Sequence, residues 1–212
     1  MKPLIAPAAA LRADRRPDHP TVVVDDVGVR YAGGERRHQV DQDFGVLVER
    51  WSGPATGIPQ YGVLDPEVQW KAADRRLCAH CLDSPEREPG GAGGLWLLRG
   101  EAARCVWPAD IRTTTPPICR EHAELALERC ATLRGGHLAV RVPEVEPVGV
   151  IGTLYDKGGP VSADELVLFT DAERLRFVLA RYLVLELRGA VLDRTLTGTR
   201  DVSRAAQRDG AT

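Results

Sequence analysis

The sequence has no excess of charge of either sign. Its 28 lysine and arginine residues are balanced by 30 aspartate and glutamate residues, so the formal net charge at pH 7 is -2. A surface that binds nucleic acid or an anionic membrane needs a local excess of basic side chains to neutralise phosphates. The composition therefore argues against a chain dedicated to either ligand, although a local basic patch stays possible.

Long hydrophobic runs are also missing. No stretch approaches the roughly 20 apolar residues that span a bilayer, and the longest apolar run, near residues 177–185, lies between Arg174 and Glu186. The N-terminal stretch resembles a secretory signal only faintly, because two prolines interrupt it and Arg12 follows it at once. We therefore expect a cytoplasmic protein that does not contact a membrane.

Cysteine is infrequent, and the number of cysteines is odd. Small secreted domains use even numbers of cysteines in a disulfide framework, whereas a Cys-x-x-Cys pair in a cytosolic chain more often binds a metal or does redox chemistry. The pattern here therefore favours a metal site. The cysteines are Cys78, Cys81, Cys105, Cys119 and Cys130.

Two short pairs of residues have the spacing of metal ligands. Cys78 and Cys81 form a Cys-x-x-Cys turn, and Cys119 and His122 stand three positions apart where a helix is expected to begin. Such a turn lets two thiolates converge on one ion, and positions i and i+3 of a helix share a face. The helix N-terminus is also expected to lower the pKa of a thiol. We therefore predict a structural Zn2+ site with these four ligands, in which a turn, a hairpin and a helix form a treble-clef-like zinc finger.

Other interpretations of these residues stay open. The cysteines could be buried and free, because free cysteine packs as a small hydrophobe, or the first pair could have a thioredoxin-like redox role. Cys105 could replace His122 as a ligand. Cys130 is expected in the core, about 16 Å along the helix from Cys119, and His80 is expected to point to solvent.

The sequence contains no set of residues with the spacing of a catalytic site. Four protein ligands would close the coordination sphere of the zinc ion, whereas catalytic zinc keeps one position for water. His122 and Glu124 match half of the nucleobase-deaminase signature, but the Pro-Cys-x-x-Cys half is missing downstream. A nuclease of the HNH type needs a histidine in the hairpin, and none lies between Cys81 and Cys119. No catalytic residue is therefore predicted.

The remaining pattern predicts an α+β fold with small antiparallel sheets. We expect a single domain over residues 21–193 with the zinc module at about 77–135, and disordered segments at 1–20 and 194–212. The expected strands span residues 21–24, 27–31, 44–51, 95–98, 103–107, 137–142 and 148–155. The strands at 95–98 and 103–107 are expected to pair as the hairpin of the zinc module.

Two helices should carry the chain into and out of the predicted ligands. Asp65 followed by Pro66 is typical of a helix start, with an N-cap and a proline at the first helical position. This helix should run toward Arg76 and deliver the chain to the first cysteine pair. The second helix should begin after Pro116-Pro117 and end at Gly135-Gly136.

A further helix is expected near the C-terminus. Thr170 and Glu173 form a Thr-x-x-Glu capping box, and residues 177–187 are apolar nearly all round. A helix that is apolar on all sides is buried or lies in an interface. We therefore expect a buried C-terminal helix, through which two copies of the chain could form a homodimer.

Four stretches between Leu77 and Tyr155 carry a resemblance to known proteins. They are LCAHC, a Gly-Leu-Trp-Leu strand, TPPICREHAELALERC and GVIGTLY. Together they resemble a group of small actinobacterial proteins of uncharacterised function with a treble-clef-like CxxC…PPxCxxH motif. The resemblance implies a zinc site and a GC-rich bacterial source, which the scarcity of lysine also favours, and it implies no activity.

The function that fits these features best is a non-enzymatic binding or regulatory module that recognises a protein or a nucleic acid. The alternative is an enzyme or accessory factor of specialised metabolism with a structural zinc and a separate pocket. A structural subunit is a third class. Several arginines near the ligands could form a basic face, although scattered solvated charges are the simpler interpretation. They are Arg75, Arg76, Arg104, Arg112 and Arg120.

Overall fold

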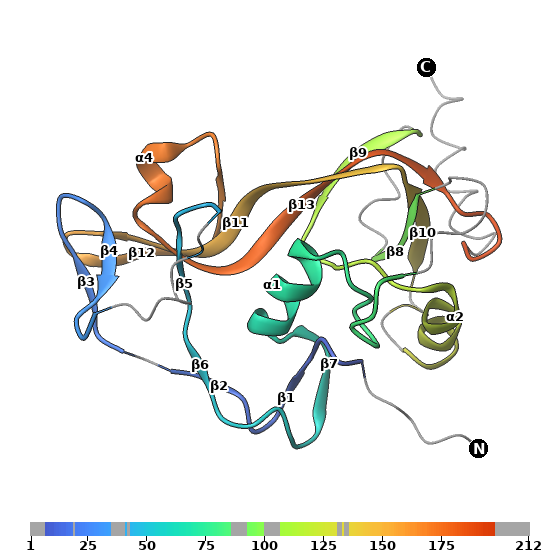
Figure 1. Cartoon of the computed structure of the whole chain (residues 1–212), viewed down its shortest axis with the longest axis horizontal. Helices are drawn as coiled ribbons and strands as arrows, with labels where there is room; N and C mark the ends of the chain where they lie inside the picture. Colours follow the sequence, from blue (N-terminus) through green and yellow to red (C-terminus); the bar gives the residue numbers. More distant parts are fainter. Residues whose placement is uncertain are drawn as a thin grey trace.

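Most of the structure is antiparallel β-sheet. A computed structural model describes residues 7–18, 20–34, 41, 43–85, 93–99, 107–130, 133 and 136–197. The main sheet in this part of the chain comprises β5 (Leu47–Val48), β8 (Gly94–Arg99), β9 (Ala109–Thr113), β10 (His137–Val142), β11 (Glu144–Asp156), β12 (Gly159–Leu168) and β13 (Val178–Leu192). Its strand order is β12-β11-β13-β10-β8, and β5 and β9 also pair with β13 (Figure 1). The α+β class is confirmed.

Smaller elements complete the described part of the chain. Its two-stranded sheets join β1 (Ala10–Arg12) with β7 (Pro59–Leu64), β2 (Arg16–Pro17) with β6 (Trp51–Ser52), and β3 (Val22–Val24) with β4 (Val29–Tyr31). Its helices are α1 (Pro66–Asp74), α2 (Arg120–Arg129) and α4 (Ala172–Leu175). Among the described residues, no helix is long and apolar enough to cross a membrane.

Strand β13 lies at the centre of the main sheet (Figure 1). It pairs with β11 on one side and with β5 and β9 on the other. Leu183 and Leu185 are fully buried, and Val184 between them is only 2% exposed. Because successive side chains of a strand point to opposite faces, β13 is covered on both faces.

The predicted C-terminal helix over residues 177–187 is therefore wrong, because this segment is the central strand. A continuous run of apolar residues is compatible with a helix that is buried on all sides. It is equally compatible with a strand that is covered on both faces. Pairing with distant strands decides between the two, and the local pattern does not contain that information. The homodimer predicted through this helix loses its basis, since the segment lies inside the sheet.

The capping signal before β13 produces only one short helical turn, α4. Asp171 is its N-cap, and the carboxylate accepts a hydrogen bond from the N–H of Arg174 at 3.1 Å. The helix ends at Arg176, whose carbonyl oxygen accepts the N–H of Val29 at 2.9 Å. Because this carbonyl group accepts a hydrogen bond from Val29, it does not accept one from a further turn of helix, and the chain continues into β13.

The N-terminal residues depart from the predicted disorder over their described part. Strands β1 and β2 lie here, and Ala9, Ala10 and Leu11 are buried. The guanidinium of Arg15 binds Asp65 at 2.9 Å. Asp65 is also the N-cap of α1, as predicted, so this ion pair fastens the N-terminal segment to the start of that helix.

The residues after β13 make defined contacts, and those from 194 to 197 do so within the segment predicted to be disordered. Asp193 binds Arg141 of β10 at 2.9 Å, and both side chains are at most 9% exposed. Burial opposes ionisation of Asp193, but hydrogen bonds from Thr195 and Arg141 outweigh it and hold the pKa of the carboxyl below its usual value. The hydroxyl of Thr197 bonds both the N–H and the carbonyl oxygen of Ala139 at 3.1 Å.

Most of the strands predicted around the metal ligands are present, and the predicted hairpin pairing stays a prediction. Residues 95–98, 137–142 and 148–155 lie in β8, β10 and β11 as expected. Strand β8 pairs with β10 along its whole length. The second strand of the predicted hairpin, 103–107, lies outside the described residues except for Trp107.

Gln69 of α1 fills a gap in the pairing of β13. The gap lies between the β5 pairing at Leu179–Ala180 and the β9 pairing that begins at Leu185. Here the N–H of Leu183 donates to Oε1 of Gln69 at 3.1 Å, and Nε2 of Gln69 donates to the carbonyl oxygen of Leu183 at 2.9 Å. Nε2 also donates to the carbonyl oxygen of Thr114 at 2.7 Å. The fully buried amide thus supplies the bonds of a missing strand residue.

Replacing Gln69 with leucine should lower the free energy of unfolding by about 3 kcal/mol, because two buried backbone groups of Leu183 lose partners worth about 1–3 kcal/mol each. Urea unfolding should show a lower midpoint with an unchanged slope. Lys71→Ala, at an exposed position of the same helix, is the matched control and should leave the midpoint nearly unchanged. Equal midpoints for Gln69→Leu and the wild type would contradict this role.

Candidate metal centre

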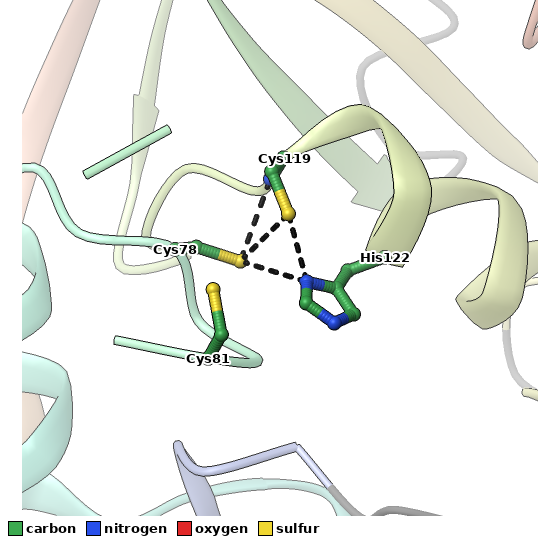
Figure 2. Close-up of side chains that lie close together, drawn as sticks. All are labelled: Cys78, Cys81, Cys119 and His122. Carbon is green, nitrogen blue, oxygen red and sulfur yellow. Dashed lines mark hydrogen bonds between the residues drawn. The ribbon is translucent and has the colours of Figure 1, made fainter. Parts of the chain in front are cut away.

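The first pair of predicted ligands lies in a tight turn that follows α1. The N–H of Cys78 donates to the carbonyl oxygen of Asp83, and the N–H of Leu82 donates to that of Cys78, both at 2.8 Å. Leu82 has a φ of 59°, in the left-handed region that bulky residues seldom adopt. This turn brings the sulfur atoms of Cys78 and Cys81 to the same side of the chain (Figure 2).

The second pair of predicted ligands lies at the start of α2. Cys119 is the N-cap of this helix, with an extended backbone, and His122 lies in the first turn. The N–H of Ala123 donates to the carbonyl oxygen of Cys119 at 2.9 Å, which closes that turn. The spacing of i and i+3 therefore places both side chains on one face, as predicted.

Backbone hydrogen bonds hold the two pairs together. The N–H of Ala79 in the turn donates to the carbonyl oxygen of Pro117 at 2.9 Å. The N–H of Cys119 donates to Sγ of Cys78 at 3.4 Å (Figure 2). The two halves of the centre are therefore positioned by the protein's own backbone.

The four predicted ligand atoms lie within 4.8 Å of one another. Sγ of Cys78 is 3.6 Å from Sγ of Cys119 and 3.7 Å from Nδ1 of His122 (Figure 2). Tetrahedral zinc, with bonds of about 2.3 Å to sulfur and about 2.0 Å to nitrogen, separates its ligand atoms by about 3.6–3.8 Å. Sγ of Cys119 and Nδ1 of His122 are closer, at 2.7 Å, which is a hydrogen-bond contact. Zinc binding would require that contact to lengthen to about 3.6 Å, and Cys78, Cys81, Cys119 and His122 lie close enough together to hold a metal ion.

The centre borders a small hydrophobic core. Cys78 is fully buried, whereas the other three ligands are partly buried. Sulfur ligands beside apolar side chains are shielded from water, which strengthens their interaction with a cation. The buried residues packed with Cys78 are Leu95, Leu97, Ile118, Ala123 and Ala139.

The three thiols differ in their readiness to ionise. Burial raises the pKa of Cys119 to about 12 and also raises that of Cys81, and the neighbouring Cys78 adds to both effects. Burial acts on Cys78 as well, but N–H groups of Cys119, Cys81 and His80 donate to its sulfur and hold its pKa below the usual value. At Cys119 burial outweighs the backbone N–H of His122, which lowers the pKa of the thiol as expected at a helix N-terminus. Since one thiolate opposes ionisation of the others, a bound cation is what would favour all three thiolates.

His80 lies between the two cysteines of the turn. It was expected to point to solvent, but it is buried. Only 7% of its surface is exposed, and its ring stacks on that of His122 with 4.0 Å between centroids and 14° between planes. The N–H groups of Ala8 and Ala9 donate to the carbonyl oxygens of His80 and Ala79 at 3.0 and 2.9 Å. This burial could not be predicted, because the spacing of a Cys-x-x-Cys turn contains no information about which distant segments pack against it.

Cys130 does not belong to the centre, as predicted. Cys130 is the C-cap of α2, at the opposite end of the helix from Cys119. Cys105 lies outside the described residues, so its predicted role as an alternative to His122 stays a prediction.

The predicted basic face is partly engaged in other contacts. Arg112 forms an ion pair with Glu186 at 3.0 Å, and Arg76 donates to the carbonyl oxygen of Val145. Arg120 donates to the hydroxyl of Thr195. Arg75 is exposed at the end of α1, and Arg104 lies outside the described residues.

Comparison of the chain with protein-family models, with curated proteins and with solved structures finds no match. The resemblance to the actinobacterial group therefore stays a prediction. Conclusions about function must come from the centre itself.

Purified wild-type protein should contain about one metal ion per chain, and Cys119→Ala should lose both the metal and thermal stability, because the unfolded chain has no such site and metal binding therefore stabilises the folded state. Elemental analysis and thermal melting measure the two effects. Cys130→Ala, on the same helix but outside the centre, is the matched control and should keep the metal. Metal retained in Cys119→Ala would show that another ligand, such as Cys105, completes the site.

Proposed function

We propose that this protein is a non-enzymatic binding or regulatory module whose fold is stabilised by a structural Zn2+ ion. The observation that carries the proposal is the convergence of three cysteine sulfurs and one histidine nitrogen within 4.8 Å. Thiolate and imidazole donors in this combination suit zinc better than magnesium or calcium, which prefer oxygen. When bound, zinc would supply a link between the turn after α1 and the start of α2.

A complete set of protein ligands supports a structural role for the ion. Four side-chain donors fill a tetrahedral coordination sphere, whereas catalytic zinc keeps a position for water or substrate. Cys78, Cys81, Cys119 and His122 supply all four donors. The enzyme alternative would need chemistry elsewhere in the chain, and no contact in the described residues favours it.

The arrangement of the ligands supports a treble-clef-like zinc finger. The tight turn at Cys78–Cys81 and the helix that starts at Cys119 match two parts of that motif. The third part is a hairpin between them, of which β8 is the described strand. Under this proposal, residues 77–135 form the zinc module.

The distribution of charge favours a protein over a nucleic acid as the partner. Arg112 is paired with Glu186, and Arg188 is paired with Glu144 and Glu186, so these basic side chains are already neutralised. The formal net charge is -2. Binding to phosphates would require breaking such pairs or using other basic residues.

The closed coordination sphere can be tested with Co2+, which takes similar donors and absorbs visible light. Addition of azide should leave the spectrum of the cobalt-loaded wild type unchanged, because no coordination position is open. His122→Ala, which removes one ligand, is the matched control and should show a new spectrum on addition of azide. A change in the wild-type spectrum would favour the enzyme alternative.

The preference for a protein partner can be tested with a labelled DNA duplex and a labelled RNA strand. We expect no binding tighter than about 10⁻⁴ M at physiological salt, measured by fluorescence anisotropy. Tighter binding that weakens steeply with salt would overturn the preference. In that case Arg75→Glu should weaken binding, and Arg30→Glu, on β4, should serve as the control with the same change of charge.

A further inference from the structure

A buried imidazole beside a metal centre requires an explanation in terms of its contacts. His80 is only 7% exposed, and it lies between two predicted ligands in the sequence. Burial removes a polar ring from water, so contacts within the protein must offset that loss. Its flat contact with the ring of His122, at 4.0 Å between centroids, points to a role at the centre.

The stacked contact restricts the orientation of the His122 ring and therefore the direction from which that ring can bind a metal ion. The lone pair of an imidazole nitrogen lies in the plane of the ring, so His122 can bind only an ion close to that plane. His122 lies in the first turn of α2, where its ring could rotate about the Cβ–Cγ bond. The ring of His80, within 14° of parallel, covers one face and restricts that rotation.

The same geometry explains why His80 does not act as a ligand itself. The lone pair of its unprotonated nitrogen lies in its own ring plane, which is nearly parallel to that of His122 and displaced from it. An ion in the plane of His122 is therefore out of reach of that lone pair. The four atoms that converge accordingly come from the other residues.

We propose that His80 is a positioning residue, whose ring holds the imidazole plane of His122 so that Nδ1 faces the cysteine sulfurs. This inference rests on the metal centre proposed above. It assigns the role to the flat ring of His80 and not to its nitrogen atoms. Its backbone carbonyl, which accepts the N–H of Ala8, is unaffected by a change of side chain.

The test compares His80→Ala, which removes the ring, with His80→Phe, which keeps a flat ring but has no nitrogen. Zinc affinity is measured by competition with a chromophoric chelator, and the coordination geometry is followed in the spectrum of bound Co2+. His80→Ala should bind zinc about 10- to 100-fold more weakly, the usual effect of removing a group that orients a ligand. Its cobalt spectrum should change, whereas His80→Phe should resemble the wild type in both measurements.

Each other outcome has a definite meaning. Wild-type affinity in His80→Ala would overturn the positioning role. An affinity as low in His80→Phe as in His80→Ala would also overturn it, because the nitrogens and not the ring would then matter. His122→Ala provides the reference for loss of a true ligand. Absence of zinc binding in the wild type would refute the proposed metal function itself, which distinguishes that failure from failure of the positioning role.

Discussion

The hydrogen bonding of β13 determines where everything else in the structure lies. This strand pairs directly with β5, β9, β10 and β11, and β8 and β12 join the sheet through β10 and β11. Its remaining backbone groups at Leu183 bond with Gln69, which fixes α1 against the strand. Because the chain leaves α1 and enters the cysteine turn, the position of Cys78 follows from that contact. The second half of the centre is also placed by the sheet, since the N–H of Ile118 donates to the carbonyl oxygen of Leu95 in β8.

The parts of the structure that could be predicted are those encoded by short patterns. Asp65 caps α1, and the pairs Cys78/Cys81 and Cys119/His122 converge, because turns and helix starts depend on neighbouring residues. The central strand could not be predicted in the same way. An apolar stretch is compatible with a buried helix or a buried strand, and only pairing with residues far away in the sequence decides between them. The same limit applies to Gln69, whose partner Leu183 is distant in the chain.

The surroundings of the Cys-x-x-Cys turn are not determined by the spacing of its cysteines. The Cys-x-x-Cys turn provides the sulfur atoms, but His80 within it is buried, and the N–H groups of Ala8 and Ala9 bind the backbone of the turn. Burial then governs the chemistry, because it raises the pKa of Cys119 despite the favourable position of this residue at a helix N-terminus. Segments before, within and after the ligand pairs therefore act together on one site.

The late position of β13 in the chain has a consequence for synthesis on the ribosome. The strands that flank it, β10 and β11, emerge before it does, and until it follows them their inner edges have no partner. Unpaired strand edges with apolar side chains are prone to associate with other nascent chains. The cysteine turn and α2, by contrast, are fully translated much earlier. The described sheet is therefore completed only when its central strand, the last of its described strands to be translated, has been made.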